Sequence, residues 1–270
     1  MRKGRLIMDE LLVERDGEVE VITLNRPEVH NSFTYGMVQS IGDVLEAAQG
    51  DDGVRAVLIT GAGDRAFCTG ADLTGRGSSR TDANTAPGMR VTTFGYSRMI
   101  SAIWALEKPV IGAINGIAAG AGCNFALSCD MVIAADTARF IQVFVRRGLV
   151  ADAGGTYFLP RLVGLAKAKE LMFLGEDLPA DKAAEIGLIY KTVPAESLMD
   201  EAMGLARRLA NGPTRSIGMM KTMLNKSFES DILTALEREA SLQGIAVSTA
   251  DVVEGILSFL QKRDPDFKGN

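Results

Sequence analysis

One acidic residue stands out because it lies among apolar neighbours rather than charged ones. Asp152 is in the segment 148–156, where Leu149 and Val150 precede it, and Phe144 and Phe158 are near in sequence. Burial disfavours a charged carboxylate, so we expect the pKa of this carboxyl to be raised. A lone carboxyl of that kind can take a proton from one carbon and return it to another.

A structural role for Asp152 is also open from the local sequence. Asp is a common helix N-cap residue, and the small residues 153–156 could begin a helix. On the local sequence alone, we favour capping over catalysis.

Two runs of small residues could bind a negatively charged oxygen. The run 114–125 follows an apolar stretch, 110–114, that reads as a buried strand, and a helix should begin within it. The first N–H groups of a helix have no partner inside it, and the helix dipole is positive there. The run 66–73 follows another strand-like stretch, 56–60, and again places small residues where a strand ends.

Together the two runs resemble the two signature segments of the crotonase (enoyl-CoA hydratase/isomerase) superfamily, and the resemblance covers roughly residues 10–268. It implies that the N–H groups of Ala71 and Ala121 hold the carbonyl oxygen of a CoA thioester. The family usually has glycine at the second position, but alanine also supplies an N–H. The implied fold is α/β, with a crotonase-type ββα spiral over residues 1–199 and a helical C-terminal trimerisation subdomain over residues 200–270.

The positions that carry catalytic acids in the family separate the possible reactions. Hydratases of the family hold and activate water with two glutamates, and Asn124 and Phe144 stand at those positions here. Asp152 stands where dienoyl-CoA isomerases and the ring-epoxide isomerases of phenylacetate breakdown carry an aspartate, and segment 154–164 resembles the second group. The resemblance therefore implies an isomerase with Asp152 as acid and base, and with Asn124, Phe144 and Tyr157 in the substrate pocket.

Other functions within the same family remain open. The chain could be an enoyl-CoA hydratase of low efficiency, or a homologue that binds CoA esters without catalysis. In a third enzymatic alternative, Asp152 attacks carbon, as an aspartate does in the aryl-CoA dehalogenases of the family.

The resemblance also implies where CoA, the carrier of the substrate, makes contact, and it implies no permanently bound cofactor. The residues expected to bind it are Arg26, Glu28, Val29, Thr69, Asp72, Leu73, Phe259 and Lys262. The last two lie three residues apart on one helix face, in a match to the family's C-terminal ending. They would act across a subunit boundary of a homotrimer or a dimer of trimers. Spacing alone fits a core phenylalanine and a solvated lysine equally well.

Composition limits the other classes of function. The chain has 270 residues, of which 47% are hydrophobic, and a net charge of −5 with dispersed basic residues. We expect a globular, cytoplasmic protein without a nucleic-acid surface. No apolar run approaches the ~20 residues of a membrane span, and the N-terminal residues lack a signal-peptide pattern. A single histidine, His30, and three cysteines without metal-ligand spacing predict no metal site.

The elements that position these residues can be outlined from periodicity. An Asp-Gly pair between two apolar alternations predicts a β-hairpin over residues 11–24. Helical spacing predicts packing helices over 34–49 and 93–106, and the polar stretch 75–88 predicts a surface loop or a lid. Short apolar runs predict strands over 54–60, 110–114, 131–135 and 139–144. From residue 165 onward the pattern is almost wholly helical, with amphipathic helices marked by Leu198, Ala202, Leu205 and Leu209, and by Val252, Val253, Ile256, Leu257 and Leu260.

Overall fold

Strands of two sheets alternate along the chain in the computed structural model, which describes residues 3–72 and 86–270, with side chains for residues 9–72 and 93–270. The strands are β1 (Lys3–Met8), β2 (Leu11–Asp16), β3 (Val19–Leu24), β4 (Ala56–Gly61), β5 (Ala66–Cys68), β6 (Val110–Ile114), β7 (Ile117–Ala119), β8 (Met131–Ala135), β9 (Arg139–Ile141), β10 (Asp177–Pro179) and β11 (Lys191–Val193). The larger sheet has the order β1-β2-β3-β4-β6-β8-β11, and the smaller has the order β10-β9-β7-β5.

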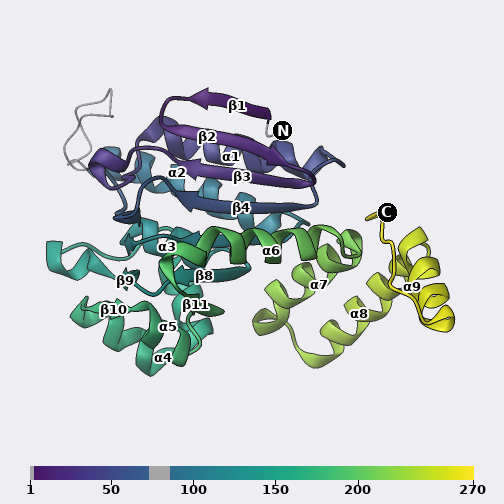
Figure 1. Ribbon diagram of the computed structural model, residues 1–270. Helices are drawn as coiled ribbons and strands as arrows, with labels where there is room; N and C mark the ends of the chain where they lie inside the picture. Colours follow the sequence, from purple (N-terminus) through teal and green to yellow (C-terminus); the bar gives the residue numbers. More distant parts are fainter. Residues whose placement is uncertain (1–2, 73–85) are drawn as a thin grey trace.

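Helices follow the strand pairs and cover the sheets (Figure 1). They are α1 (Tyr35–Gly50), α2 (Ala86–Ala105), α3 (Ala121–Leu127), α4 (Gly155–Leu174), α5 (Ala180–Glu185), α6 (Leu198–Ala210), α7 (Thr214–Lys226), α8 (Ile232–Ala246) and α9 (Ala250–Gln261). Short 3-10 helices are η1 (Pro27–Val29), η2 (Val143–Arg147), η3 (Ala195–Ser197) and η4 (Ser227–Glu229).

Each turn of the chain gives one strand to each sheet and then a helix. β4 joins the large sheet, β5 the small one, and α2 follows; β6, β7 and α3 repeat this order, as do β8, β9 and α4. Neighbouring turns pair in parallel in both sheets. The ββα spiral expected from the resemblance is therefore confirmed.

The predicted N-terminal hairpin is confirmed. β2 and β3 pair antiparallel with Asp16 opposite Val19, and Gly17 takes a φ of 62° in the turn. That left-handed conformation is one that glycine adopts without steric cost. β1 adds a further antiparallel strand beyond β2 that the sequence pattern did not indicate.

Several predicted boundaries were wrong. The strand expected over 139–144 ends at Ile141, and Phe144 lies in η2, because a short apolar run reads the same in a strand and in a buried turn. The region after residue 165 also contains β10 and β11, whose three residues are too few to show a strand period. α2 begins at Ala86, and residues 75–85 of the predicted loop or lid lie outside the described part of the chain.

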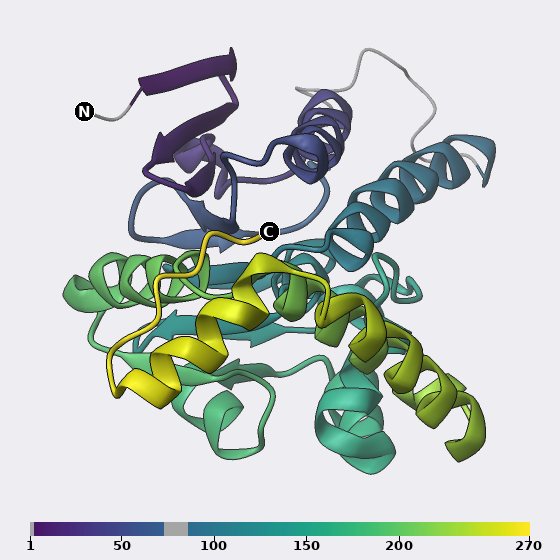
Figure 2. The ribbon, with the colours of Figure 1, turned by 90° about the vertical axis from the view of Figure 1, so that its right-hand side faces the viewer.

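The helices form layers on both faces of the large sheet. In Figure 1, α6 lies in front of the sheet and α1 and α2 lie behind it, and Figure 2 shows these layers on opposite sides. The predicted amphipathic face of α6 is confirmed, since Leu198 and Ala202 are buried and Leu205 and Leu209 pack against the core. The predicted division between residues 199 and 200 falls at the start of this helix and stays a prediction.

The last three helices leave the core, but buried cations tie α7 to it (Figure 1). The ammonium group of Lys221 donates to the carbonyl of Ile103 at 2.8 Å and to the carboxylate of Asp130 at 2.8 Å. The guanidinium of Arg55, beside β4, donates to Thr214 Oγ1 at 2.8 Å. These bonds hold α7 against the core.

The remaining sequence predictions concern cysteines and membrane spans. Cys68, Cys123 and Cys129 are buried and unpaired, as expected, and burial raises the pKa of Cys68 and of Cys123 to about 12. Within residues 3–72 and 86–270, no single helix has the length and apolar character needed to cross a membrane. α8 and α9 meet that requirement only as a pair, which is bent by 81°.

The fold analysis predicts opposite effects for two helical Gly→Ala changes. A Cβ on Gly122 would lie 2.3 Å from the carbonyl oxygen of Cys68, whereas a Cβ on Gly204 meets nothing within 4 Å. We expect Gly122→Ala to lower the free energy of unfolding by about 1–3 kcal/mol through overpacking. Gly204→Ala should raise it by roughly 0.5–1 kcal/mol through helix propensity. Urea unfolding followed by circular dichroism measures both, and equal effects would contradict this account of Gly122.

Candidate active site

Two backbone segments meet at the centre of the site. The carbonyl oxygen of Cys68, at the end of β5, lies so close to α3 that Gly122 has no room for a side chain. A Cβ on Gly70 would lie 3.2 Å from the nitrogen of Ala121. The peptide group that precedes Ala71 and the one that precedes Ala121 are therefore neighbours.

The N–H groups of these two residues are not used by the strand and helix that carry them. Phe33 pairs with this segment by donating its N–H to the carbonyl of Gly70 at 2.7 Å and accepting the N–H of Asp72 at 3.0 Å. Since successive N–H groups alternate in direction along an extended chain, the N–H of Ala71 points away from Phe33. The N–H of Ala121 is the first of a helix, and in the described part of the chain neither group has a protein acceptor.

A buried ion pair braces the turn that carries Ala71. Nη2 of Arg26 lies 2.9 Å from Oδ2 of Asp72, and both side chains are almost fully buried. Nη1 of Arg26 donates to the carbonyl of Ser32 at 2.7 Å, and Nε lies 3.3 Å from Oε1 of Glu10. The structure thus places Arg26 and Asp72, two residues predicted to bind CoA, in contact with each other.

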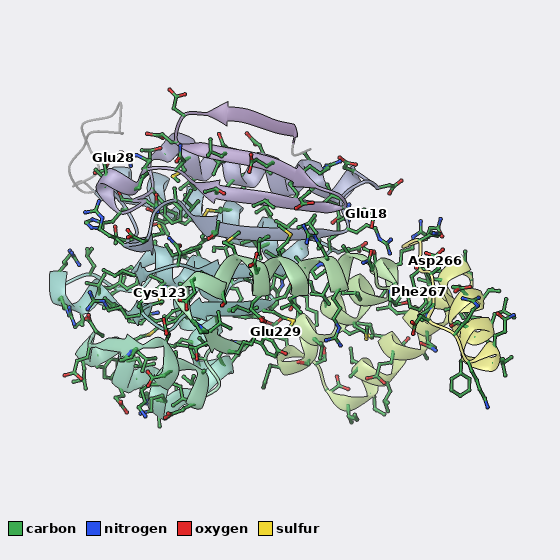
Figure 3. The ribbon with its side chains drawn as sticks, viewed as in Figure 1. Glu18, Glu28, Cys123, Glu229, Asp266 and Phe267 are labelled. Atoms are coloured by element: carbon green, nitrogen blue, oxygen red, sulfur yellow. The ribbon has the colours of Figure 1, made fainter. Side chains whose placement is uncertain are left out.

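The other predicted CoA-binding residues form two separate groups. Glu28 is exposed on η1, Val29 and Thr69 are partly buried beside it, and Leu73 lies outside the described residues. Phe259, which is 81% exposed, and Lys262 lie at α9, far from α3 in Figure 1. Figure 3 shows the same separation between Glu28 and Cys123 at one end and Phe267, next to α9, at the other.

Asp152 lies in the loop between η2 and α4 and is partly buried. Burial is the main cause that raises the pKa of its carboxyl from 3.8 to about 6, against a lowering effect of its own backbone N–H. Its Oδ1 has no hydrogen-bond partner among the described residues. The capping alternative is wrong, because α4 starts after Gly154 and no side chain caps it.

Asn124, on α3, and Phe144, in η2, stand at the positions of the hydratase glutamates. The side chain of Asn124 is fully buried, and its Nδ2 donates to the carbonyl of Asp152 at 2.8 Å. Phe144 is 9% exposed, and its Cζ would lie 3.8 Å from a Cβ on Gly120, just before the first turn of α3. Neither residue supplies a base.

Tyr157 has partners on two sides. Its hydroxyl donates to Oε1 of Glu229 at 2.6 Å, which links α4 to η4, and the guanidinium of Arg161 lies 3.6 Å from its ring centroid. Its ring packs edge-on against Trp104 at 5.2 Å. Figure 3 shows Glu229 between the core and the C-terminal helices, so the Tyr157 hydroxyl faces that junction.

A face of α2 that the sequence did not single out lies near Asp152. Cγ2 of Ile100 would lie 3.5 Å from a Cβ on Gly154, and Trp104 packs on Phe158 at 5.6 Å. Tyr96 is 2% exposed, and burial is the main cause that raises its pKa. The negative charges of Asp152 and, to a lesser extent, Cys68 raise it further. Helical spacing marks these residues as one apolar face, but gives no sign of what the face contacts.

Comparisons with known proteins match the chain to proteins named for reactions of CoA esters. The family model described as enoyl-CoA hydratase/isomerase matches residues 14–270. The chain is 42% identical to a 1,2-epoxyphenylacetyl-CoA isomerase of Escherichia coli, covering 97% of this chain and 100% of the relative. It is 40% identical to a probable enoyl-CoA hydratase of Rhodobacter capsulatus, covering 92% and 94%.

A solved structure gives the same result for the fold. The 1.8 Å crystal structure of an enoyl-CoA hydratase from Bacillus anthracis is 32% identical in sequence and superposes with a TM-score of 0.91. The alignment covers 97% of this chain and 100% of that chain. Relatives with the same fold thus carry both isomerase and hydratase names.

The raised pKa of Asp152 predicts that its removal stabilises the protein at neutral pH. The pKa of this carboxyl is higher in the folded protein than its ordinary value of 3.8. Its contribution to the free energy of unfolding is therefore fully present below about pH 3.8 and is lost as the pH rises through about 6. Asp152→Asn should therefore raise the free energy of unfolding at about pH 7.5 by roughly 1–3 kcal/mol. Urea unfolding of both proteins measures the difference.

The gain should shrink as the pH falls from about 6 to about 4, because the wild-type carboxyl becomes neutral. Asp64→Asn, which removes an exposed carboxyl, serves as the control and should change stability little at either pH. A gain that grows as the pH falls would contradict a carboxyl whose ionised form is disfavoured by burial.

Proposed function

Since this chain belongs to the enoyl-CoA hydratase/isomerase family, we propose that it is a CoA-thioester isomerase that moves a proton between carbons of the acyl group through Asp152. The observation that carries the proposal is the carboxyl of Asp152, whose pKa is raised to about 6 and whose loop is hydrogen-bonded to α3, the helix that begins with the Ala121 N–H. A carboxyl with that pKa is ionised at neutral pH and is still a stronger base than an exposed aspartate.

The chemistry follows from the thioester. Removing a proton next to the carbonyl, or at the far end of a conjugated double bond, places negative charge on the carbonyl oxygen. The N–H groups of Ala71 and Ala121 stabilise that oxygen most when it is most negative, and one such donor is typically worth about 3 kcal/mol of barrier. Asp152 then returns the proton to a different carbon, which shifts the double bond.

The replacement of the glutamate pair supports isomerisation over hydration. Addition of water needs a group that holds the water and a base that deprotonates it. Asn124 uses its amide to bind the main chain of Asp152, and Phe144 presents an apolar ring. Hydration of an enoyl-CoA is the alternative function, because several relatives are named as hydratases.

The side chains near Asp152 support a bulky apolar acyl group. Ile100, Trp104 and Phe158 lie on the side of the Asp152 loop that faces α2. The E. coli relative is named for a substrate with a phenylacetyl group. We extend the proposal to acyl chains that are branched or carry a ring.

The contacts of CoA and the assembly are part of the same proposal. Glu28, Val29 and Thr69 lie on the segments next to Ala71, where the CoA moiety would pass. Phe259 and Lys262 lie at α9, away from α3 of the same chain. They would instead contact the CoA bound to a neighbouring copy in a homotrimer or a dimer of trimers. CoA is carried in as part of the substrate, and no permanently bound cofactor is proposed.

Deuterium incorporation from D2O tests the assignment of Asp152. With 3-hexenoyl-CoA, crotonyl-CoA and phenylacetyl-CoA, proton NMR should show wild-type exchange next to the carbonyl or at the far end of the double bond. Asp152→Asn should slow that exchange by at least about a hundredfold, since it removes the base. The dissociation constant for the CoA ester should change little.

The control is Asp64→Asn, which should exchange at the wild-type rate. Full exchange by Asp152→Asn would remove the assignment. Formation of 3-hydroxyacyl-CoA from crotonyl-CoA in labelled water would favour a hydratase, and a trapped acyl-aspartate in the mass spectrum would favour nucleophilic attack. A wild-type protein that binds the esters without exchange would be a non-catalytic binder.

The pKa of Asp152 predicts the acid limb of the pH profile. Only the ionised carboxylate can take a proton, so kcat/KM for exchange should fall tenfold per unit below about pH 6. It should be level from about pH 6.5 upward, since Asp152 is then ionised. An acid limb near pH 4 would show that the carboxyl is exposed to water in the working enzyme.

A further inference from the structure

Two buried amide side chains connect three elements of the site. Nε2 of Gln142, which follows β9, donates to Oδ1 of Asn124 at 2.8 Å. Nδ2 of Asn124, on α3, donates to the carbonyl oxygen of Asp152 at 2.8 Å. Gln142 is 4% exposed and Asn124 is 0% exposed, so water does not compete for these bonds.

The direction of both bonds is determined by chemistry. The carbonyl of Asp152 can only accept, so the atom of Asn124 that faces it has to be Nδ2. Oδ1 of Asn124 then faces Gln142, which has to present its own NH2 group. Both hydrogen bonds therefore run in the same direction: Gln142 donates to Asn124, and Asn124 donates to Asp152.

The loop that receives the second bond is held in conformations that need support. Ala153 has a φ of 47° and Gly154 has a φ of 77°. A left-handed conformation is unfavourable for a residue other than glycine. A Cβ on Gly155 would lie 2.3 Å from Nδ2 of Asn124, so the loop is packed directly onto this side chain.

The helix that carries Asn124 also carries one of the two thioester donors. Asn124 lies three residues after Ala121, which puts both near one face of the single short helix α3. A bond from Asn124 to the main chain of Asp152 fixes the distance between the proton-transfer carboxyl and the Ala121 N–H. That distance has to match the spacing of carbonyl oxygen and carbon in the substrate.

Resting on the function proposed above, we propose that Asn124, oriented by Gln142, is a positioning residue that holds Asp152 at its working distance from the Ala71 and Ala121 donors. Asn124 occupies the position of a hydratase glutamate, but it acts on the enzyme's own main chain. A carboxylate there would set a negative oxygen against the carbonyl oxygen of Asp152. In this structure a carboxylate at position 124 would therefore lose the bond to the Asp152 loop and repel it.

The first set of variants tests the bond to Asp152. Asn124→Ala should lower kcat for deuterium exchange into 3-hexenoyl-CoA by about 10- to 100-fold, with KM within roughly threefold, because the substrate still binds while the base is displaced. Asn124→Asp should lower kcat at least as much. It should also move the acid limb to higher pH, since a second carboxylate beside Asp152 disfavours its ionised form.

The second set tests the role of Gln142, which touches neither Asp152 nor the donors. Gln142→Met removes the NH2 group at similar length, and Gln142→Glu replaces it with an acceptor that turns the Asn124 amide around. We expect kcat to fall with Gln142→Glu more than with Gln142→Met. In the Asn124→Ala background, Gln142→Met should have no further effect, because its action passes through Asn124.

A matched control lies on the same helix. Ser128→Ala removes a buried hydroxyl that donates to the carbonyl of Phe125 at 2.7 Å, without touching the Asp152 loop. It should cost stability of a similar size and leave kcat and the pH profile unchanged. A loss of kcat with Ser128→Ala equal to that of Asn124→Ala would show that only helix stability matters, and would overturn the inference.

A structural readout separates this inference from the proposed function. The N–H of Gly155 donates to the carbonyl of Asp152 at 3.0 Å, and its hydrogen exchange reports the order of the loop. Faster exchange at Gly155 in Asn124→Ala, but not in Ser128→Ala, supports the inference even if Asp152→Asn keeps its activity and the proposed function fails. Unchanged exchange at Gly155 together with unchanged kcat overturns the inference while leaving the proposed function intact.

Discussion

The close approach of two backbone segments, the end of β5 and the first turn of α3, is the constraint on which the rest of the site depends. No Cβ fits at Gly122 against the carbonyl of Cys68, and none fits at Gly116 against the main chain of Arg65. Only main-chain atoms meet there, so the peptide groups before Ala71 and Ala121 lie side by side. Donors held by secondary structure do not rotate away when a ligand leaves, which is the basis of a preorganised oxyanion site.

The small sheet explains how residues far apart in sequence reach that point. β5, β7 and β9 are parallel neighbours, so their carboxyl ends meet at one edge of the sheet. Ala71 follows β5, Ala121 follows β7, and Gln142 follows β9. Each turn of the spiral therefore supplies one part of the site. This is the general place for a ligand in parallel sheets, outside the carboxyl ends of the strands.

Much of this could be predicted from the sequence, because strand ends and small residues leave a local signal. The two runs of small residues, the hairpin and the face of α6 are examples. The contacts of Asn124, Arg26 and Tyr157 could not be predicted, since their partners lie 28, 46 and 72 residues away in the chain. An amide or a guanidinium fits a ligand and a protein carbonyl equally well, so residue type alone does not distinguish them. The three-residue strands of the small sheet are likewise too short for a period to show.

The proposed reaction also accounts for why one carboxyl is placed where it cannot be well solvated. Before proton transfer, the negative charge lies on Asp152, whose ionised form is disfavoured by burial. After transfer it lies on the thioester oxygen, between two N–H donors. The site holds one negative charge throughout, and only its position changes. Each unit by which the pKa of Asp152 is raised makes the proton transfer to it about 1.4 kcal/mol less uphill.

A second carboxylate would add repulsion to the state in which the enolate carries the charge. A proton-transfer carboxyl beside a neutral amide at position 124 is therefore suited to moving a proton between carbons, and poorly suited to activating water.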